Sequence, residues 1–453
     1  MADKPRKVAI DLLRAVRADD AYANLTLPTL LREAKLDSRD AAFATELGYG
    51  TLRAQGVLDE IVDQCSNRPV AKLDPNVLDL LRLGSYQLLR TRVPAHAAVA
   101  STVELARSVG ASRATGFVNA VLRKVGARDW DDWTARLAAG RGELAGLAVR
   151  DAHPAWVADA FATALDDHSP FADTAAALTA DDTRPVTHLV ALPGLLDRDD
   201  LVAAAHGEPA PFSPYGVRLD TGGDPSDLAP VRARTAAVQD EGSQLVARAL
   251  ALAPLDGPDA RWADLAAGPG GKAALLGAIA RERGARVTAT ELHPHRAELV
   301  RHRIAPLNAA GPGDTVTVEV GDARLLESGD FDRVLLDAPC TGLGALRRRP
   351  EARWRRTPAD VAPLAVLQGE LLDAAVRVTR PGGVIAYVTC SPHPAETTAV
   401  VDAALARHAG LARLDARAAF PDVPDLGDGP TVQLWPHRHG TDAMFCALLR
   451  VAP

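Results

Sequence analysis

The sequence reads Val334-Leu-Leu-Asp-Ala-Pro-Cys-Thr-Gly-Leu-Gly344 in the last third of the chain. The apolar run at its start is typical of a buried parallel strand. The run breaks at Asp337, and a proline and Cys340 follow. In open α/β sheets, ligands bind beyond the carboxyl ends of the strands. The stretch therefore puts an acid and a thiol where such a fold carries its chemistry.

A second apolar run, residues 384–388, ends in the same way, in Thr389-Cys390-Ser391. Two thiols that follow matching strands favour a functional role for Cys340 and Cys390 at the carboxyl edge of the sheet. The alternative for each is a small core thiol, because unpaired cysteine is often buried.

Strand and helix patterns alternate from about residue 260 to the C-terminus. Strands are expected over 261–264, 286–290, 315–320, 334–336, 384–388 and 444–449. The alternation predicts an α/β fold with a doubly wound, Rossmann-like sheet, and we assign this domain to residues 236–453.

The first part of the chain has a helical period instead. Residues 1–140 are expected to form an all-helical domain, in which Asp74-Pro75 marks one helix start. Residues 141–235 are expected to hold a helical connection and a small α+β subdomain, because short strand patterns there are separated by many Pro and Gly residues.

Composition limits the classes of function. The net charge of −7 argues against binding nucleic acid through the field of the whole chain, so any such contact must be local. Four widely spaced cysteines without a CxxC pair argue against a disulfide framework and a zinc site. No apolar run of about 18 residues is present, and we expect a cytoplasmic monomer with no membrane contact and no metal.

A glycine-rich turn between a strand and a helix predicts a ligand site. Its backbone can approach a ligand closely, and the helix start favours negative charge. Successive strands end in Glu291, Asp322 and Asp337. Three negative charges would repel the pyrophosphate of a dinucleotide, but they can bind the hydroxyls of a ribose, the amino group of an adenine and a positive charge. S-adenosyl-L-methionine has these three features. The turn consists of Ala266, Ala267, Gly268, Pro269, Gly270, Gly271 and Lys272.

Two sets of motifs resemble known families. The segments 264–272, 337–344 and 389–392 are similar to motifs of RNA cytosine-C5 methyltransferases, and 46–53, 83–89 and 117–124 resemble the NusB-type RNA-binding domain. Together they cover nearly the whole chain and resemble the Sun/Fmu (RsmB-type) subgroup, which modifies 16S rRNA. The chain departs from the usual motif at Ala266, Gly268 and Glu291, where Cys, Ala and Asp are commoner, while Pro-Gly-Gly-Lys is intact.

The resemblance implies roles for particular residues. Cys390 matches the nucleophile that attacks C6 of the cytosine, and Cys340 the second cysteine, which assists release of the methylated RNA as a base. Asp337 matches a residue at the cofactor and the cytosine edge, and Lys272 a residue near the base. The chemistry requires a thiol, because C5 of a pyrimidine has no lone pair and becomes nucleophilic only after addition at C6. The target base must also leave any stack.

An arginine-rich run follows the Cys340 stretch, with six arginines and one acid between positions 347 and 356. We predict a phosphate clamp for the RNA; the alternative is a solvated charge run. The arginines are Arg347, Arg348, Arg349, Arg353, Arg355 and Arg356.

Two other functions stay open. The same chemistry could act on tRNA or 23S rRNA, since the motifs do not choose the RNA. A different class is a non-catalytic NusB-like RNA-binding or antitermination protein, which predicts decay of the cysteine or glycine motifs; they are intact.

Overall fold

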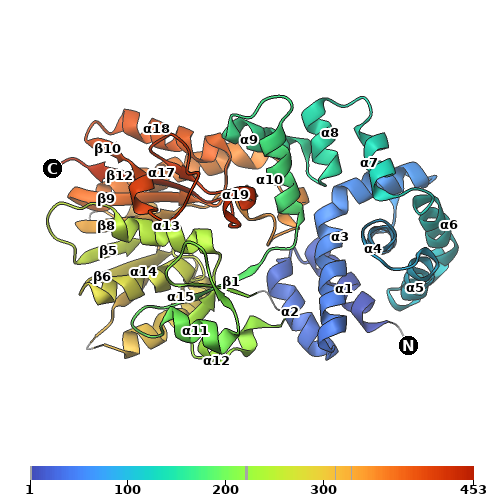
Figure 1. The fold of residues 1–453 in the computed structure, drawn as a ribbon, viewed down its shortest axis with the longest axis horizontal. Coiled ribbons are helices and arrows are strands. Elements are labelled where there is room, and N and C mark those ends of the chain that lie inside the picture. Colours follow the sequence, from blue (N-terminus) through green and yellow to red (C-terminus); the bar gives the residue numbers. More distant parts are fainter. Residues whose placement is uncertain (1–2, 220–222, 312, 328) are drawn as a thin grey trace. The chain divides into compact units, whose positions relative to one another are not determined.

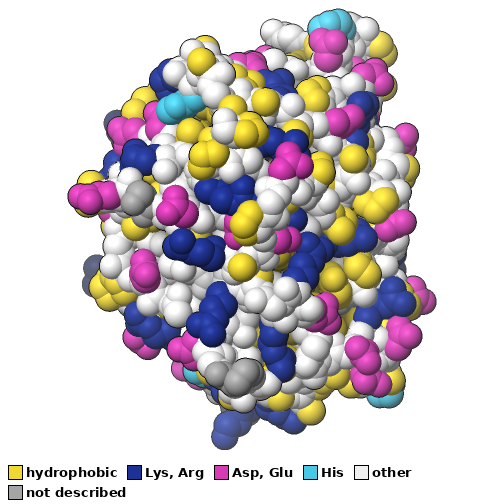
Figure 2. All heavy atoms as spheres, turned by 90° about the vertical axis from the view of Figure 1, so that its left-hand side faces the viewer, with side chains coloured by type: hydrophobic (Ala, Val, Ile, Leu, Met, Phe, Trp, Pro, Cys, Tyr) yellow, Lys and Arg dark blue, Asp and Glu magenta, His cyan; other side chains and the backbone are white. Residues whose placement is uncertain are grey.

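The chain forms two compact units in this computed structural model, which describes residues 3–219, 223–311, 313–327 and 329–453. One unit is Met1–Arg184 with Leu346–Arg356, and the other is Pro185–Ala345 with Thr357–Pro453. The three-part division at residues 140 and 235 stays a prediction. On the face drawn in Figure 2, Lys and Arg side chains lie among acidic and hydrophobic ones, as the weakly acidic composition leads one to expect.

The first unit is helical and has its own apolar core (Figure 1). The predicted helix start at Asp74-Pro75 is confirmed, because the Asp74 carboxylate accepts hydrogen bonds from Asn76 N and Val77 N. Over the described ranges, no helix has the length and apolar character needed to cross a membrane. The helices are α1 (Lys4–Ala18), α2 (Ala23–Ala34), α3 (Ser38–Cys65), α4 (Pro75–Arg90), α5 (Ala95–Ser108), α6 (Thr115–Val125), α7 (Trp130–Ala138), α8 (Glu143–Arg150), α9 (Ala155–Leu165), α10 (Ala172–Asp182) and α16 (Ala352–Arg355).

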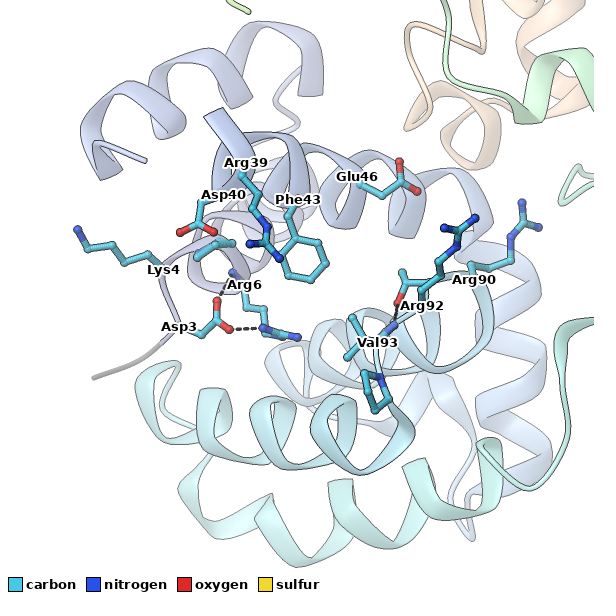
Figure 3. Close-up of a pocket in the computed structure, with 13 residues that line it drawn as sticks. Asp3, Lys4, Arg6, Arg39, Asp40, Phe43, Glu46, Arg90, Arg92 and Val93 are labelled. Atoms are coloured by element: carbon cyan, nitrogen blue, oxygen red, sulfur yellow. Dashed lines mark hydrogen bonds and ion pairs between the residues drawn. The ribbon is translucent and has the colours of Figure 1, made fainter. Parts of the chain in front are cut away.

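An open cavity of about 900 Å³ lies on this helical unit, between the start of α1, the first turns of α3 and the end of α4 (Figure 3). Arg39 and Phe43 line it from α3, and Arg90 and Arg92 from the end of α4 and the turn after it. Arg90 pairs with Asp182 at 2.7 Å. The cavity is thus partly basic and has one aromatic wall.

The second unit begins with a small antiparallel sheet in the order β2-β3-β1-β4. Leu189, Ala191 and Val217 pack beneath it against Leu201 of α11. Its elements are β1 (Thr187–Ala191), α11 (Arg198–Ala205), β2 (Glu208–Pro209), β3 (Gly216–Leu219), α12 (Ala229–Arg232) and β4 (Ala236–Val238).

The large sheet has the order β10-β12-β9-β8-β5-β6-β7, and β11 pairs with β12. Strands β7, β6, β5, β8 and β9 are parallel, and β12 runs antiparallel to β9. The predicted doubly wound Rossmann-like sheet is therefore confirmed. Its strands are β5 (Arg261–Asp264), β6 (Arg286–Glu291), β7 (Val316–Val320), β8 (Phe331–Asp337), β9 (Thr379–Thr389), β10 (Leu411–Leu414), β11 (Val432–Gln433) and β12 (Phe445–Val451).

Helices cover both faces of this sheet because its central strands are apolar on both sides (Figure 1). Along β8, Leu335 packs into one core, whereas Val334 and Leu336 pack into the other. Helices α13 (Glu241–Leu252), α14 (Gly271–Glu282) and α15 (Pro294–Ala309) cover the first face, and α17 (Val361–Val378) and α18 (Thr398–Arg407) cover the second. The short helix α19 (Pro436–His439) precedes β12.

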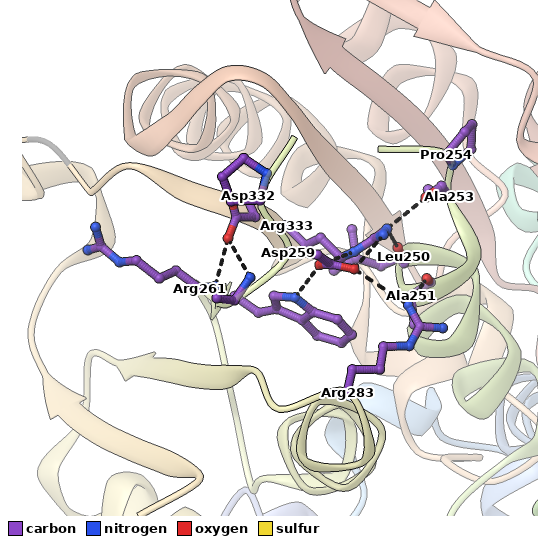
Figure 4. Close-up of polar contacts among 12 residues, drawn as sticks. Leu250, Ala251, Ala253, Pro254, Asp259, Arg261, Arg283, Asp332 and Arg333 are labelled. Atoms are coloured by element: carbon purple, nitrogen blue, oxygen red, sulfur yellow. Dashed lines mark hydrogen bonds and ion pairs between the residues drawn. The ribbon is translucent and has the colours of Figure 1, made fainter. Parts of the chain in front are cut away.

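A polar network ties β5 to β8 where both strands begin (Figure 4). Asp332 accepts hydrogen bonds from Ala260 N and Arg261 N at 2.8 and 2.7 Å. Arg333 pairs with Asp259 and donates to the Leu250 and Ala253 carbonyls at the end of α13. The network aligns the two strands and leaves their carboxyl ends for the chemistry.

Candidate active site

The carboxyl ends of β8 and β9 bring the two predicted thiols together. The two strands are parallel neighbours with Asp337 opposite Val388, so the turns after them start at the same level. Cys340 Sγ and Cys390 Sγ lie 3.4 Å apart, and both residues are partly exposed. Cys65 and Cys446 are buried elsewhere, and burial raises the pKa of Cys446 to about 12. Only the motif cysteines thus form a pair with access to solvent among the described residues.

The turn after Cys340 returns close to the second thiol. Gly344 N donates to the Cys390 carbonyl at 2.9 Å, and the Gly344 carbonyl accepts from Ala443 N at 2.8 Å. A Cβ at position 344 would lie 2.2 Å from the Ala443 carbonyl oxygen, so only glycine fits there. The glycine of the motif therefore joins the two cysteine turns.

Lys272 and Asp337 form an ion pair beside the thiols, with Nζ and Oδ2 2.7 Å apart. Lys272 lies in the first turn of α14, and Asp337 is the last residue of β8. Burial opposes the charge on Lys272, but Asp337 and Cys390 outweigh it and raise the pKa of the ammonium. The pair keeps a cation fixed at the carboxyl edge of the sheet.

The electrostatic surroundings of the two thiols differ. The pKa of Cys340 is raised well above its ordinary value by the contact with Cys390 and by burial, and further by the carboxylates of Glu396 and Asp337. Cys390 instead interacts with the Lys272 ammonium. The surroundings therefore favour a protonated thiol at Cys340 and provide a cation near Cys390.

The glycine-rich turn from Ala266 to Lys272 has a backbone that few other residues could adopt. Gly268 and Gly270 have φ angles of +57° and +90°. A Cβ at position 270 would lie 3.0 Å from Val300 Cα, so the turn packs directly against α15. The turn then leads into the amino end of α14, whose N–H groups face the carboxyl edge of the sheet.

The acids at the next strand ends have partners within the chain. Glu291 accepts from Gly268 N at 3.0 Å and from His293 N at 2.9 Å, which fixes its carboxylate against the glycine turn. Asp322 accepts from the Arg324 guanidinium and backbone N–H, and these hydrogen bonds lower its pKa. The cofactor roles assigned to both acids stay predictions.

The sequence did not indicate a role for Asp264, the last residue of β5. Its side chain is fully buried, one oxygen accepts from Ala266 N at 3.3 Å, and the other has no hydrogen-bond partner. Burial and the charge of Asp337 raise the pKa of Asp264 to about 7. An acid at a strand end was the available signal. Its orphan oxygen, with the glycine turn and Glu291, fits a ligand with hydroxyl groups and a positive charge.

The structure contradicts part of the phosphate clamp predicted for the arginine-rich run, because some of its arginines are buried. Leu346–Arg356 belongs to the helical unit. The prediction is wrong for Arg353, which is fully buried and donates to the Ala152 and Asp181 carbonyls at 3.0 and 2.9 Å. Arg355 donates to the carbonyl of Val16, in the last turn of α1, and to the carbonyl of Ala21, just after that helix.

The other residues of the run also include both buried and exposed side chains. Arg347 is 7% exposed and is thus also poorly placed for a phosphate. Trp354 donates to the Arg53 carbonyl at 2.8 Å and packs where Gly56 leaves room. Arg349 is exposed, and its phosphate contact, like those of Arg348 and Arg356, stays a prediction.

Comparison with known proteins places this arrangement in a family. Residues 249–450 match the model of the 16S rRNA methyltransferase RsmB/F family, and residues 3–127 match the NusB family. A protein of Mycobacterium tuberculosis named as a methyltransferase is 55% identical over 99% of this chain and 96% of its own length. The chain belongs to the RsmB/F methyltransferase family. It is thus an S-adenosylmethionine-dependent RNA methyltransferase with a NusB-like domain.

Other relatives extend the comparison. The ribosomal RNA small subunit methyltransferase B of Pseudomonas putida is 34% identical over 91% of each chain. The crystal structure of PH0851 shares the fold with a TM-score of 0.82, at 20% identity over 99% of each chain. The structure of NSun6 from Pyrococcus horikoshii, solved with SFG, has a TM-score of 0.55 and 19% identity, covering 66% of this chain and 98% of that one.

Proposed function

We propose that this RsmB/F methyltransferase methylates C5 of a cytosine in 16S rRNA through a temporary bond between Cys390 and C6 of the base. The observation that carries the proposal is the pair of thiols, 3.4 Å apart, beside the Lys272–Asp337 ion pair. Methylation of an amino group or a ring nitrogen uses an existing lone pair and needs no thiol. Methylation of C5 does need one.

The charges around the thiols support Cys390 as the nucleophile. The Lys272 ammonium stabilises a thiolate at Cys390, whereas the carboxylates near Cys340 oppose one there. The charges thus favour the same cysteine as nucleophile that the motif resemblance implies. We assign to Asp337, which is paired with Lys272, the role of accepting from the cytosine edge.

The residues act in an order that balances bonds and protons. The Cys390 thiolate adds to C6, and the electron pair of the C5–C6 double bond becomes available at C5. S-adenosylmethionine, when bound, would supply the electrophilic methyl group that C5 takes, with the bond from its sulfonium sulfur to the methyl group breaking and S-adenosylhomocysteine leaving. A base then removes the C5 proton, the double bond re-forms, and the electron pair of the S–C6 bond returns to Cys390.

Cys340 is suited to be that base only after Cys390 has reacted. In the resting site, contact with Cys390 is the largest cause of the raised pKa of Cys340. Once the Cys390 sulfur is bonded to carbon, it carries no negative charge, and that cause is removed. Cys340 can then ionise and accept the C5 proton at the step that requires it.

The test identifies the product nucleoside. The protein would be incubated with S-adenosylmethionine and unmodified 16S rRNA, and the digested RNA would be analysed by mass spectrometry against 5-methylcytidine and N4-methylcytidine standards. We expect 5-methylcytidine with the wild-type protein and none with Cys390→Ala. N4-methylcytidine would overturn the C5 assignment, and product only in parallel reactions with tRNA or 23S rRNA would overturn the substrate assignment.

A further inference from the structure

A buried carboxylate connects the turns that carry the two thiols. Glu396 ends a 3-10 turn (Pro394–Glu396) after β9, and its side chain is inaccessible to solvent. It accepts hydrogen bonds from Thr341 N at 2.8 Å, from the Thr341 hydroxyl, and from Ser391 Oγ at 2.7 Å. Thr341 directly follows Cys340, and Ser391 directly follows Cys390. One carboxylate thus holds the residue next to each thiol.

The carboxylate is itself held by the elements around it. Gln368 of α17 donates from Nε2 to Glu396 Oε1 at 3.2 Å and to the Pro339 carbonyl at 2.8 Å. The Tyr387 hydroxyl of β9 donates to the Glu396 carbonyl at 2.8 Å. The bridge is therefore anchored to the strand that leads to Cys390 and to a helix that also holds the Cys340 turn.

We propose that Glu396 is a positioning residue that sets the distance between the Cys340 and Cys390 thiols. Its effect on catalysis rests on the function proposed above, whereas its effect on thiol spacing does not. Glu396 Oε2 accepts from the hydroxyls of both turns, and Oε1 accepts from Thr341 N and Gln368 Nε2, so one side chain takes bonds from the two turns at once. Burying a charge is costly unless it is fully hydrogen-bonded, so the bridge has little freedom to shift.

Glu396 also acts through its charge. Its carboxylate is one of the groups that raise the pKa of Cys340. It therefore helps to keep Cys340 protonated while Cys390 is the thiolate. Position and charge can be separated by substitution, because glutamine preserves the length of the side chain and removes the charge.

The spacing is measured with phenylarsine oxide, which binds two close thiols by forming two As–S bonds and releasing one water. Capture by a dithiol depends on both sulfurs being within reach of one arsenic, so it reports distance without RNA or cofactor. We expect tight binding to the wild-type protein, and about tenfold weaker binding to Glu396→Ala. Cys340→Ala and Cys390→Ala define the affinity of a single thiol.

The charge is measured by the pH dependence of iodoacetamide alkylation, followed by mass spectrometry at each cysteine. Because Glu396→Gln removes a negative charge beside Cys340, we expect alkylation of Cys340 to move to lower pH. Phenylarsine oxide binding should stay within about threefold of wild type, because the Thr341 and Ser391 hydroxyls can accept from the new amide as well as donate. Loss of phenylarsine oxide binding in Glu396→Gln would show that the charge of Glu396 is needed for the spacing of the thiols, and would overturn the claim that the two effects are separable.

Glu241 provides the matched control, because it is also fully buried and accepts two backbone hydrogen bonds, from Phe212 N and Ser213 N. Glu241→Ala should leave phenylarsine oxide binding unchanged. If Glu396→Ala does not fold, two single-arm variants replace it: Ser391→Ala removes the Ser391 hydrogen bond, and Thr341→Val removes the hydroxyl bond of Thr341 and keeps its backbone bond. Each should weaken capture.

Two outcomes distinguish this inference from the proposed function. Wild-type dithiol affinity in Glu396→Ala, or in both single-arm variants, would overturn the inference whatever reaction the protein catalyses. Weakened capture in a protein whose wild type makes no 5-methylcytidine would support the bridge and overturn the proposed function. With both correct, methyl transfer by Glu396→Ala falls about 10²-fold, because small misplacements of reacting groups are costly.

Discussion

Two stretches that are neighbours in the sequence, Pro339–Gly344 and Leu346–Arg356, belong to different structural units. The first stays at the carboxyl edge of the large sheet, where its thiol meets Cys390. The second belongs to the helical unit, where Arg353 is buried. A residue that follows a strand is placed by the topology of the sheet. A run of charges has no such constraint, and its members can stabilise a fold from within.

Near the first stretch, the substitution Lys272→Met is expected to have the largest effect on catalysis. Methionine keeps an apolar side chain of similar length and removes the cation. Without the ammonium, Cys390 loses the charge that stabilises its thiolate and Asp337 loses its partner. We expect methyl transfer to fall by about 10²- to 10³-fold in single-turnover assays. Alkylation of Cys390 should also move to higher pH.

The control for this variant is Lys72→Met, an exposed lysine of the helical unit. It should leave both measurements unchanged. A wild-type alkylation profile in Lys272→Met would remove the electrostatic basis for choosing Cys390 as the nucleophile.

In the second stretch, we expect substitutions to lower the stability of the fold rather than the rate of methyl transfer. Arg353→Ala leaves the Ala152 and Asp181 carbonyls without their donor and Asp182 without a buried partner. We expect the free energy of unfolding of the helical unit to fall by about 3 kcal/mol in urea titrations. Arg349→Ala, at an exposed position of the same run, should change it by less than about 0.5 kcal/mol. Equal losses in the two variants would contradict the contrast between buried and exposed arginines.

A smaller effect is expected at Asp264 and depends on pH. Its pKa is about 7 in the folded protein against an ordinary value of 3.8, so the folded state retains a proton that the unfolded state releases. The resulting stabilisation is complete below pH 3.8 and is lost as the pH rises to about 7. Asp264→Asn cannot ionise and should raise the melting temperature at pH 8, by the equivalent of about 1–3 kcal/mol, and less at pH 5.

Asp322→Asn is the opposing control, because Arg324 lowers the pKa of Asp322. This substitution should lower or leave unchanged the stability at pH 8. The melting temperatures are measured by calorimetry of the cofactor-free protein at the two pH values. A lower melting temperature for Asp264→Asn than for wild type at pH 8 would refute a raised pKa of Asp264.

The sequence predicts best what regular structure determines. Alternating strand and helix patterns, with acids and thiols just after the strands, were enough to anticipate the sheet and the position of Cys340 and Cys390 after two of its strands. The role of Glu396 was not visible, because a carboxylate in a turn is typical of a solvated surface until its hydrogen bonds are known. The prediction that Arg353 binds phosphate was wrong for the same reason. Burial depends on tertiary packing, and the sequence does not distinguish the buried arginines of this run from the exposed ones.

The central claim is that Cys390 forms the bond to RNA and Cys340 acts after it. The most direct test incubates wild type, Cys390→Ala and Cys340→Ala with S-adenosylmethionine and labelled 16S rRNA and resolves them on a denaturing gel. We expect a covalent protein–RNA band that accumulates in Cys340→Ala and is absent in Cys390→Ala. A band in Cys390→Ala, or normal methylation by both variants, would contradict it.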